Sequence, residues 1–307
     1  MNNARKTLFT GLKDLRNFFD KRNFMEVATP PMVENPGMEV HIHPFKVDRA
    51  QNNSSTDYFL QTSPEFAMKE LLSEGFEKIY NISYCFRDEP ESSTHRPQFL
   101  MLEWYRANAD YNLIKEDCRE LVLELPNSPF KALEQVTVSE LFLEFCNFDI
   151  LEFLNKDDLY QKLTADFKEL SVTKELPWED LFFMLFLNKI EVEFKNFPAL
   201  IVDEYPAPLS ALSTIKESDP RVCQRFELYL NGLEVANCFN ELINLEEQKE
   251  RFEKDSQKKN ALYGYELPKP TQFYNSLTKG LPPSAGIAMG VERLLMAIHD
   301  RDDLFFN

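Results

Sequence analysis

The clearest pattern in the chain is a pair of alternating segments separated by a polar loop. Residues 80 to 89 alternate between apolar and polar positions and end with Arg87 and Glu89, and the return segment carries Glu103 and Tyr105 at one parity. Side chains two residues apart in a strand share a face, so we predict two adjacent antiparallel strands whose polar faces form one wall of a site. Charges in such strands are costly to bury unless a ligand or partner binds them.

Several other segments in the N-terminal quarter have a clear period. Apolar residues recur at helical spacing near the start of the chain, and two prolines close a short strand after it. A serine followed by a proline favours a helix start, because Ser caps the helix and Pro suits its first turn. The predicted elements are a helix over 4–22, a short strand ending at Pro30 and Pro31, a strand over 40–47, and a helix from Ser63 and Pro64 to about Gly75.

The segment RFELYLNGLEVANCFNEL predicts a β-hairpin, because Asn231-Gly232 is a strong signal for a two-residue turn. With that turn, Glu227 pairs with Ala236, and Glu227 and Glu234 become diagonal neighbours on one face. Two carboxylates held that close repel each other unless a cation lies between them, and Mg²⁺ bound through carboxylates and phosphates meets that need. Two exposed acids on a solvated face are an equally favoured alternative.

Near the C-terminus, GIAMGVERLLMAIHD joins a strand of small residues to a helix with Arg293 in its first turn. Gly286, Ala288 and Gly290 alternate, so one face of the strand is almost bare. Such a face accepts either a flat ligand or a close packing contact, and the pattern favours neither. The remaining predicted elements are a mainly helical insertion over 126–200 and a charged helix over 245–259.

Composition and charge narrow the class of protein. The chain has 307 residues, 43% of them hydrophobic and 13% aromatic, which is enough for a large core. Its net charge of -17 argues against a nucleic-acid binder. The five cysteines are odd in number and lack a CxxC pair, which is typical of reduced thiols rather than a disulfide framework or a zinc site. With no signal peptide and no apolar run near ~20 residues, we expect a soluble cytoplasmic protein without membrane contact.

Three segments resemble, in order, the three signature motifs of class II aminoacyl-tRNA synthetases. They are the helix and strand before Pro30, the strand-loop-strand with Phe86-Arg87-Asp88-Glu89, and Gly-x-Ala-x-Gly-x-x-Arg ending at Arg293. Together with THRPQFLMLEWYR and GLEVANCFNEL, they look like the lysyl-tRNA synthetase branch over residues 4 to 300. The resemblance implies an α+β fold, an antiparallel β-sheet flanked by helices, and a homodimer with the first motif at its interface.

Within that family, the chain is most similar to a free-standing branch. Lysyl-tRNA synthetases carry an N-terminal OB-fold domain that reads the anticodon, whereas here the catalytic helix begins within the first ten residues. We therefore expect residues 1–307 to form a single catalytic domain without an OB-fold domain. The free-standing branch activates (R)-β-lysine with ATP and transfers it to a lysine of elongation factor P. The resemblance thus implies an ATP-dependent ligase with elongation factor P as acceptor and no tRNA.

The resemblance also implies an ATP site. Arg87 and Arg293 would be the catalytic residues, with Arg87 polarising the α-phosphate for attack by the substrate carboxylate. Arg293 would stack on the adenine opposite Phe99 and reach the γ-phosphate. Glu89 would accept a hydrogen bond from the adenine amino group. The full ATP-binding set is Arg87, Asp88, Glu89, Arg96, Phe99, Glu234, Val235, Gly290 and Arg293.

A second set of residues would bind the amino acid. Glu65 would face the amino group near the carboxylate, and Glu103, Tyr105 and Glu241 would hold the distal ammonium. Ala288 stands where lysyl-tRNA synthetases usually have Gly, and its methyl group would narrow the pocket near the α-carbon. The full set is Ser63, Pro64, Glu65, Glu103, Tyr105, Glu241 and Ala288, with Glu227 and Glu234 as the ligands of Mg²⁺.

The chain departs from the family pattern at several positions. Asp88 replaces the usual Asn, Arg96 and Gln98 stand in His-Arg-Pro-Gln-Phe where relatives have His-Asn-Pro-Glu-Phe, and Cys238 and Asn240 replace Gly and His or Ser. Two other interpretations therefore stay open. One is a truncated lysyl-tRNA synthetase that charges tRNA, and the other is a non-catalytic paralogue that regulates a partner.

Overall fold

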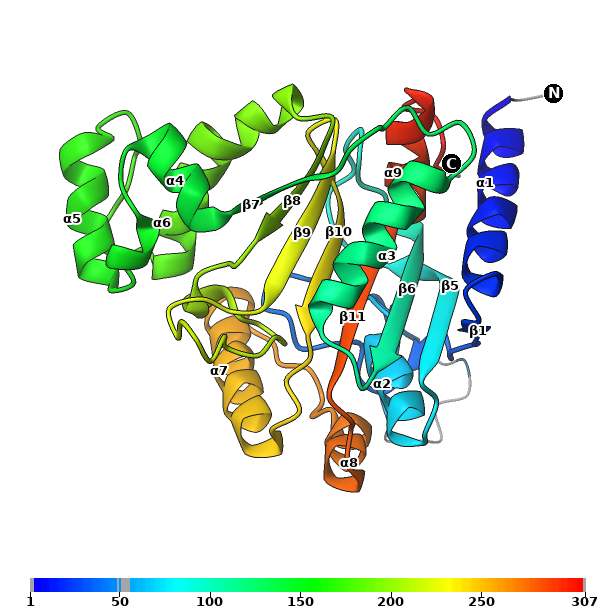
Figure 1. Ribbon diagram of the computed structural model, residues 1–307. Helices are drawn as coiled ribbons and strands as arrows, with labels where there is room; N and C mark the ends of the chain where they lie inside the picture. The colour runs from blue at the N-terminus through cyan, green and yellow to red at the C-terminus, as the bar shows by residue number, and fades with distance from the viewer. Residues whose placement is uncertain (1–2, 49, 51–55, 306–307) are drawn as a thin grey trace. The chain divides into compact units, whose positions relative to one another are not determined.

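The structure is a computed structural model that describes residues 3–48, 50 and 56–305. Its contacts divide the chain into two compact units: unit 1 contains Met1–Ser128 and Glu241–Asn307, and unit 2 contains Pro129–Asn240. Each unit combines a β-sheet with helices (Figure 1), which confirms the predicted α+β class. Within the described ranges, no helix is both long and apolar enough to span a membrane.

Four strands of unit 1 follow the order β1-β5-β6-β11. The β5–β6 and β6–β11 pairs are antiparallel, as predicted, whereas the short edge strand β1 runs parallel to β5. A second, antiparallel sheet has the order β2-β4-β3. The bounds are β1 Met25–Glu26, β2 Met32–Val33, β3 Lys46–Val47, β4 Tyr58–Leu60, β5 Lys78–Phe86, β6 Gln98–Ala107 and β11 Ser284–Gly290.

The strand predicted over 40–47 is wrong except for its last two residues. The backbone carbonyls of Glu39, Val40 and Ile42 accept hydrogen bonds from the buried ammonium of Lys259, at 3.0, 3.0 and 2.7 Å. These carbonyls therefore accept hydrogen bonds from a side chain on α7 (Leu245–Tyr263) and not from the backbone of a neighbouring strand. An alternating pattern does not reveal such a partner, because the lysine lies more than 200 residues away in the sequence.

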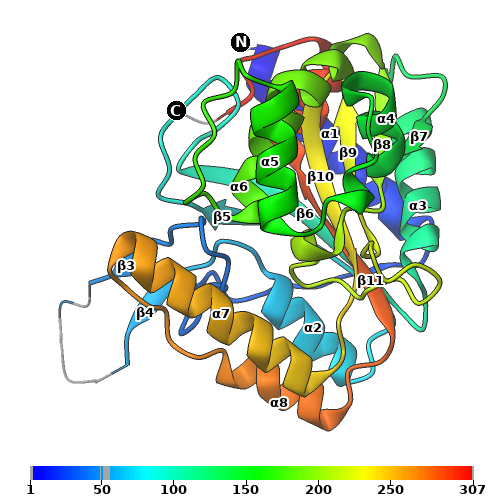
Figure 2. The same ribbon diagram turned by 90° about the vertical axis from the view of Figure 1, so that its left-hand side faces the viewer.

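Five helices of unit 1 form two groups, and a sixth, α3, packs against β11. α1 packs beside α9. α2, α7 and α8 lie together (Figure 2). The ring of Phe19 on α1 stacks on Tyr80 of β5, with 4.7 Å between ring centroids, and this contact joins the first helix to the sheet. The bounds are α1 Asn3–Asp20, α2 Glu65–Ser73, α3 Tyr111–Glu124, α7 Leu245–Tyr263, α8 Thr271–Lys279 and α9 Val291–His299.

Unit 2 contains four strands in the order β10-β9-β8-β7 and a group of helices between β7 and β8. Only the β7–β8 pair is parallel among these strands. The helices pack around an aromatic core in which Phe182 stacks on Phe142 and Trp178, at 5.3 and 5.4 Å between centroids. The bounds are β7 Glu134–Thr137, α4 Val138–Cys146, α5 Lys156–Asp166, α6 Trp178–Leu185, β8 Ala199–Asp203, β9 Arg225–Leu230 and β10 Leu233–Asn240.

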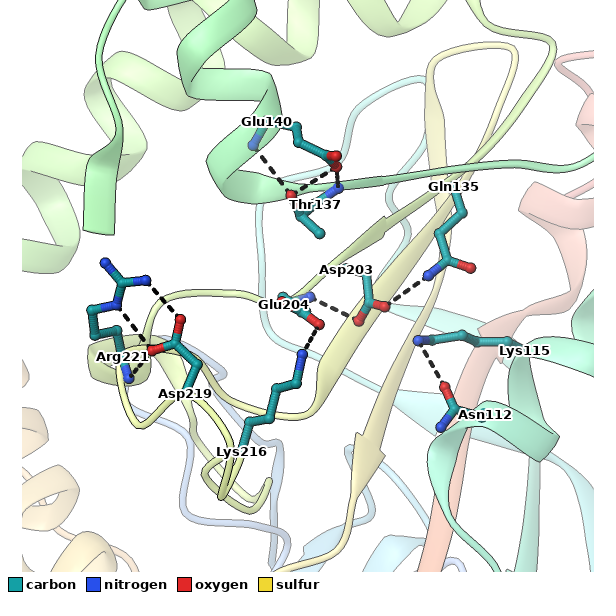
Figure 3. A network of polar contacts seen from close by, with 10 residues as sticks. All are labelled: Asn112, Lys115, Gln135, Thr137, Glu140, Asp203, Glu204, Lys216, Asp219 and Arg221. Carbon is teal, nitrogen blue, oxygen red and sulfur yellow. Dashed lines mark hydrogen bonds and ion pairs between the residues drawn. The ribbon is translucent and has the colours of Figure 1, made fainter. Parts of the chain in front are cut away.

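A capping box starts the helical part of unit 2 (Figure 3). Thr137 Oγ1 accepts from the backbone N–H of Glu140 at 3.2 Å, and Glu140 Oε2 accepts from the backbone N–H of Thr137 at 2.8 Å. Two otherwise unpaired donors are thereby satisfied where the chain turns from β7 into α4. Beside this turn, Gln135 donates to Asp203 Oδ2 at 3.0 Å and ties β7 to β8.

The predicted hairpin is present, but its register changes beyond the turn. Asn231 and Gly232 have φ of 51° and 79°, as a type I′ turn requires. A β-bulge between Glu234 and Ala236 then shifts the pairing, so that Glu227 lies opposite Asn237. The predicted pairing of Glu227 with Ala236 is therefore wrong.

The turn provides a test of the local backbone. In Gly232→Ala, the left-handed φ costs about 1 kcal/mol, and the new Cβ would lie 3.0 Å from the backbone nitrogen of Lys195, which adds about 1–3 kcal/mol of overpacking. Gly264 is the matched control, since its φ is +74° but a Cβ there would meet nothing within 4 Å. Urea unfolding should show a larger loss for Gly232→Ala than for Gly264→Ala. Equal losses would contradict the crowding at Gly232.

Candidate active site

Glu103 is the centre of a buried polar group on β6 in unit 1. Its side chain is completely buried, accepting from Ser63 Oγ at 2.6 Å and from the Tyr105 hydroxyl at 3.0 Å. Burial raises the pKa of Glu103 to about 8, and the nearby carboxylate of Glu65 adds to this rise. The structure thus brings together four of the predicted amino-acid-binding residues.

Lys69 connects the other acids of this group, and sequence reasoning missed it. Its Nζ lies 2.5 Å from Glu65 Oε1 and 2.5 Å from Glu241 Oε2. Burial raises the pKa of Glu241, whereas the two carboxylates keep Lys69 charged and raise its pKa. A signal was present in the sequence, because Lys69 follows Glu65 by four residues on a predicted helix and sits next to apolar Met68.

Strand β11 lies against this group with its small residues. Ala288 pairs with Glu103 and Gly286 pairs with Tyr105. A Cβ on Gly286 would lie 2.0 Å from the ring of Tyr105, so the tyrosine ring covers this glycine. At Gly286 the bare face therefore accepts a close packing contact, and it makes room for the two polar side chains of β6.

A small cavity of about 30 Å³ borders the same group, lined in part by Ser63, Pro64, Glu65 and Glu39. This volume holds about one water molecule. Burial raises the pKa of Glu39, and the carboxylate of Glu65 raises it further while Arg87 lowers it. Glu39 is thus a further acid close to both Glu65 and Arg87, and the predicted strand over 40–47 gave no indication of it.

The expected nucleotide-binding residues begin where β5 ends. The strand stops at Phe86, so Arg87 and Glu89 lie in the following loop, and the prediction that they project from one strand face is wrong. The reason is a change of partner, because the backbone N–H of Asp88 donates to the His43 carbonyl at 2.7 Å. A cleft of about 550 Å³ opens there, lined by His43, Pro44, Asp88, Glu89, Pro90 and Tyr265.

Arg87 directly precedes two of these lining residues and places its guanidinium beside Phe99. Its guanidinium carbon lies 5.2 Å from the centroid of the Phe99 ring. Its Nε is buried and has no hydrogen-bond partner among the described residues. A buried donor without a partner is costly, so this position is suited to an anionic ligand.

Arg293 and Phe99, the two expected adenine neighbours, are linked through the backbone. Both carboxylate oxygens of Glu292, the residue before Arg293, accept from the backbone N–H of Leu100 at 3.0 Å. Burial raises the pKa of Glu292 to about 7. This contact fixes the start of α9 against β6, directly beside Phe99, while Gly290 pairs with Met101.

The loop between β5 and β6 bonds two of the three arginines of the expected ATP site, Arg96 of the loop itself and Arg293 of α9. Arg293 donates to the Thr94 carbonyl at 3.2 Å and to His95 Nε2 at 2.8 Å. Because the guanidinium only donates, His95 is neutral here, in agreement with the pKa of His95 being lowered by burial and by Arg293. Arg96 donates to the backbone carbonyls of Ser92 and His95 within its own loop.

In unit 2, the bonds of Glu227 do not fit the expected magnesium site. Glu227 Oε1 accepts from Arg225 at 2.6 Å, and Oε2 accepts from the hydroxyls of Tyr205 and Tyr229 at 2.5 and 2.6 Å. The carboxylate is thus buried and already neutralised by a protein cation. Glu234 is half-buried, and its neighbour Val235 is buried. Among the residues that the structure describes, no cluster of three His, Cys, Asp or Glu side chains has the arrangement of a metal site.

Comparison with known proteins agrees with this geometry. The family model described as tRNA synthetases class II (D, K and N) matches residues 3–304. Three relatives carry the name elongation factor P (R)-β-lysine ligase. They come from Erwinia tasmaniensis (35% identity, 93% of this chain and 87% of the relative), Vibrio cholerae (34%, 96% and 91%) and Vibrio campbellii (36%, 92% and 87%). With this match over nearly its whole length and the buried carboxylates of its site, the chain belongs to the class II tRNA synthetases of the D, K and N group.

Proposed function

We propose that this protein activates (R)-β-lysine, or lysine, with ATP and transfers it to a lysine side chain of elongation factor P. The observation that carries the proposal is the buried group of Glu65, Glu103 and Glu241, which is suited to a substrate with two ammonium groups. The names of the relatives support the same substrate and acceptor. Ala288 lies opposite Glu103 in the sheet, and its methyl group would narrow the pocket near the α-carbon, which suits a substrate with its amino group at the β position.

The reaction proceeds in two steps. The carboxylate of the amino acid attacks the α-phosphorus of ATP, and pyrophosphate leaves. The ε-amine of the acceptor lysine then attacks the carbonyl carbon of the adenylate, and AMP leaves with its bonding electron pair. Arg87 stabilises the charge that develops on the α-phosphate, while Phe99 and Arg293 hold the adenine and Glu89 accepts from its amino group.

Membership in the family implies the use of ATP. Magnesium would accompany the nucleotide through its phosphates and neutralise the leaving pyrophosphate. We assign only Glu234 to this ion, because the oxygens of Glu227 already accept from Arg225 and two tyrosines.

We also propose that the two units form one catalytic domain and that the protein is a homodimer. The family model spans both units. The segment that resembles the interface motif exposes large apolar side chains: Phe9 and Met25 are each 55% exposed and Met32 is 47% exposed. Burying such side chains against a second copy removes apolar surface from water.

The first test is ATP–pyrophosphate exchange by the purified protein, with (R)-β-lysine and α-lysine supplied separately. We expect faster exchange with the β isomer, followed by transfer to elongation factor P. Exchange with α-lysine alone, together with tRNA lysylation, would favour the truncated synthetase. Exchange with neither amino acid would favour the non-catalytic paralogue.

A second test addresses Arg87. Removing a donor aimed at developing charge should lower the rate of exchange by about 10²-fold or more in Arg87→Ala. Arg119→Ala is the control, because Arg119 lies on α3 and pairs with Glu116 near the surface. If Arg87→Ala retains the wild-type rate, Arg87 does not act on the α-phosphate.

A third test uses the pKa of Glu103. A carboxyl group with a pKa of about 8 is mostly protonated at pH 6.5, so binding an ammonium there must release a proton. At saturating ATP, kcat/KM for the amino acid should therefore rise about 15-fold between pH 6.5 and 8 and level off above about pH 9. Glu103→Gln should lose much of both the activity and this rise. A flat wild-type profile would contradict an ionised Glu103 in the complex.

A further inference from the structure

Lys69 is a fully buried cation inside a pocket that we propose binds another cation. Its side chain has 0% exposed surface, and its ammonium lies 2.5 Å from Glu65 on the preceding turn of α2 and 2.5 Å from Glu241. The ring of Phe273 lies 5.4 Å away and closes one side. Lysines are almost never buried to this extent unless they are paired, so the two carboxylates keep it in place.

A count of charges gives Lys69 a specific role. Glu65, Glu103 and Glu241 contribute three negative charges when ionised, and Lys69 contributes one positive charge, so the group carries -2. A substrate with two ammonium groups neutralises that charge completely. Without Lys69, the same two ammonium groups would face three carboxylates, and one buried carboxylate would stay uncompensated.

We propose that Lys69 is a positioning residue that matches the charge of the pocket to a diamino acid and holds Glu65 and Glu241 in their binding positions. This inference rests on the proposed function of the site. Lys69 does not touch the reacting atoms, and it acts through the two carboxylates that it bonds.

The second fully buried lysine of unit 1 shows the contrast. Lys259 donates to the backbone carbonyls of Glu39, Val40 and Ile42 and forms no ion pair with a carboxylate among the described residues. Burial lowers the pKa of Lys259, whereas the pKa of Lys69 is raised by its two acids. Lys259 therefore stabilises the backbone of residues 39–42, whereas Lys69 neutralises part of the negative charge of the pocket.

Other charged and titratable groups surround the pocket and bear on any pH profile. Glu39 is close to Glu65 and to Arg87, and Cys85 is close to Glu103. Among the described residues, the titratable and charged groups that act on Lys69, on its acids or on one another here are Glu39, Glu65, Cys85, Arg87, Glu103, Tyr105 and Glu241. A substitution at Lys69 leaves all the other groups in place. A change in the pH dependence of kcat/KM therefore reports on the charge of Lys69.

The test compares the shape of the pH dependence in wild type and Lys69→Met. In the wild type, both excess carboxyls must ionise for substrate to bind, so kcat/KM for the amino acid rises with pH and then reaches a plateau. In Lys69→Met, two carboxyls must ionise but the third must stay protonated to avoid an uncompensated charge, so kcat/KM passes through a maximum and falls at higher pH. We expect a loss of at least about tenfold at pH 8 and this maximum in place of the plateau, with the KM for ATP unchanged.

Two controls separate this role from a loss of folding. Lys259→Met removes a buried lysine of the same size and should lower the melting temperature while keeping the plateau. Lys254→Met removes an exposed lysine of α7 and should leave both unchanged. A profile of Lys69→Met that rises to a plateau like that of the wild type, at whatever level of activity, would overturn the proposal.

A double variant keeps the proposal testable if Lys69→Met does not fold. Glu65→Gln alone leaves the pocket at -1, and Lys69→Met/Glu65→Gln restores -2. Removing Lys69 in the Glu65→Gln background should therefore raise kcat/KM for the amino acid. If it lowers kcat/KM instead, Lys69 does not set the charge. A wild-type protein that neither binds nor exchanges any lysine isomer would refute the proposed function itself, which is a separate outcome from a pH profile that Lys69→Met leaves unchanged in shape.

Discussion

The burial of more carboxylates than cations is the constraint on which the rest of this site depends. Glu65, Glu103 and Glu241 share one buried region with a single lysine. Like charges in a medium of low polarity raise one another's pKa, so the ligand-free group holds protons that a bound ammonium must displace. Ser63 and Tyr105 donate to Glu103 and keep its oxygens oriented before any substrate arrives. The pocket is thus prepared for positive charge by its own excess of negative charge.

The residues that we propose bind ATP are held differently from the buried acids. The arginines among them are positioned by contacts and strand ends of the backbone. Glu292 joins the start of α9 to the N–H of Leu100, so Phe99 and Arg293 are positioned by the same contact. Arg87 follows the last residue of β5, and its Nε has no partner within the described ranges. In this arrangement the arginines that we propose bind phosphate lie at strand and helix ends, while the acids of the proposed amino-acid pocket lie on β6, on α2 and directly after β10.

In unit 2, the buried carboxylate of Glu227 stabilises the fold through its hydrogen bonds. Arg225, Tyr205 and Tyr229 satisfy both oxygens of Glu227 inside the sheet. A carboxylate bonded in this way contributes to the fold of β9 and β10, because leaving it unpaired there would cost several kcal/mol. The bulge after Glu234 changes the register at the same place. Glu234 still pairs with Tyr229, so the register keeps the two acids as diagonal neighbours, and it is the three bonds of Glu227 that weigh against the role its spacing to Glu234 suggested.

The sequence by itself determined the main elements and the location of the polar wall. Alternation and the Asn231-Gly232 turn gave β5, β6 and the hairpin, since period and turn chemistry are local properties. The motifs identified the family because they occur in order along the chain. Only the tertiary structure decided the ion pairs of Lys69, the loop carbonyls bonded by Lys259 and the end of β5 at His43. Each of those depends on residues far apart in sequence, and a buried charge acquires its role only from the partners that folding brings to it.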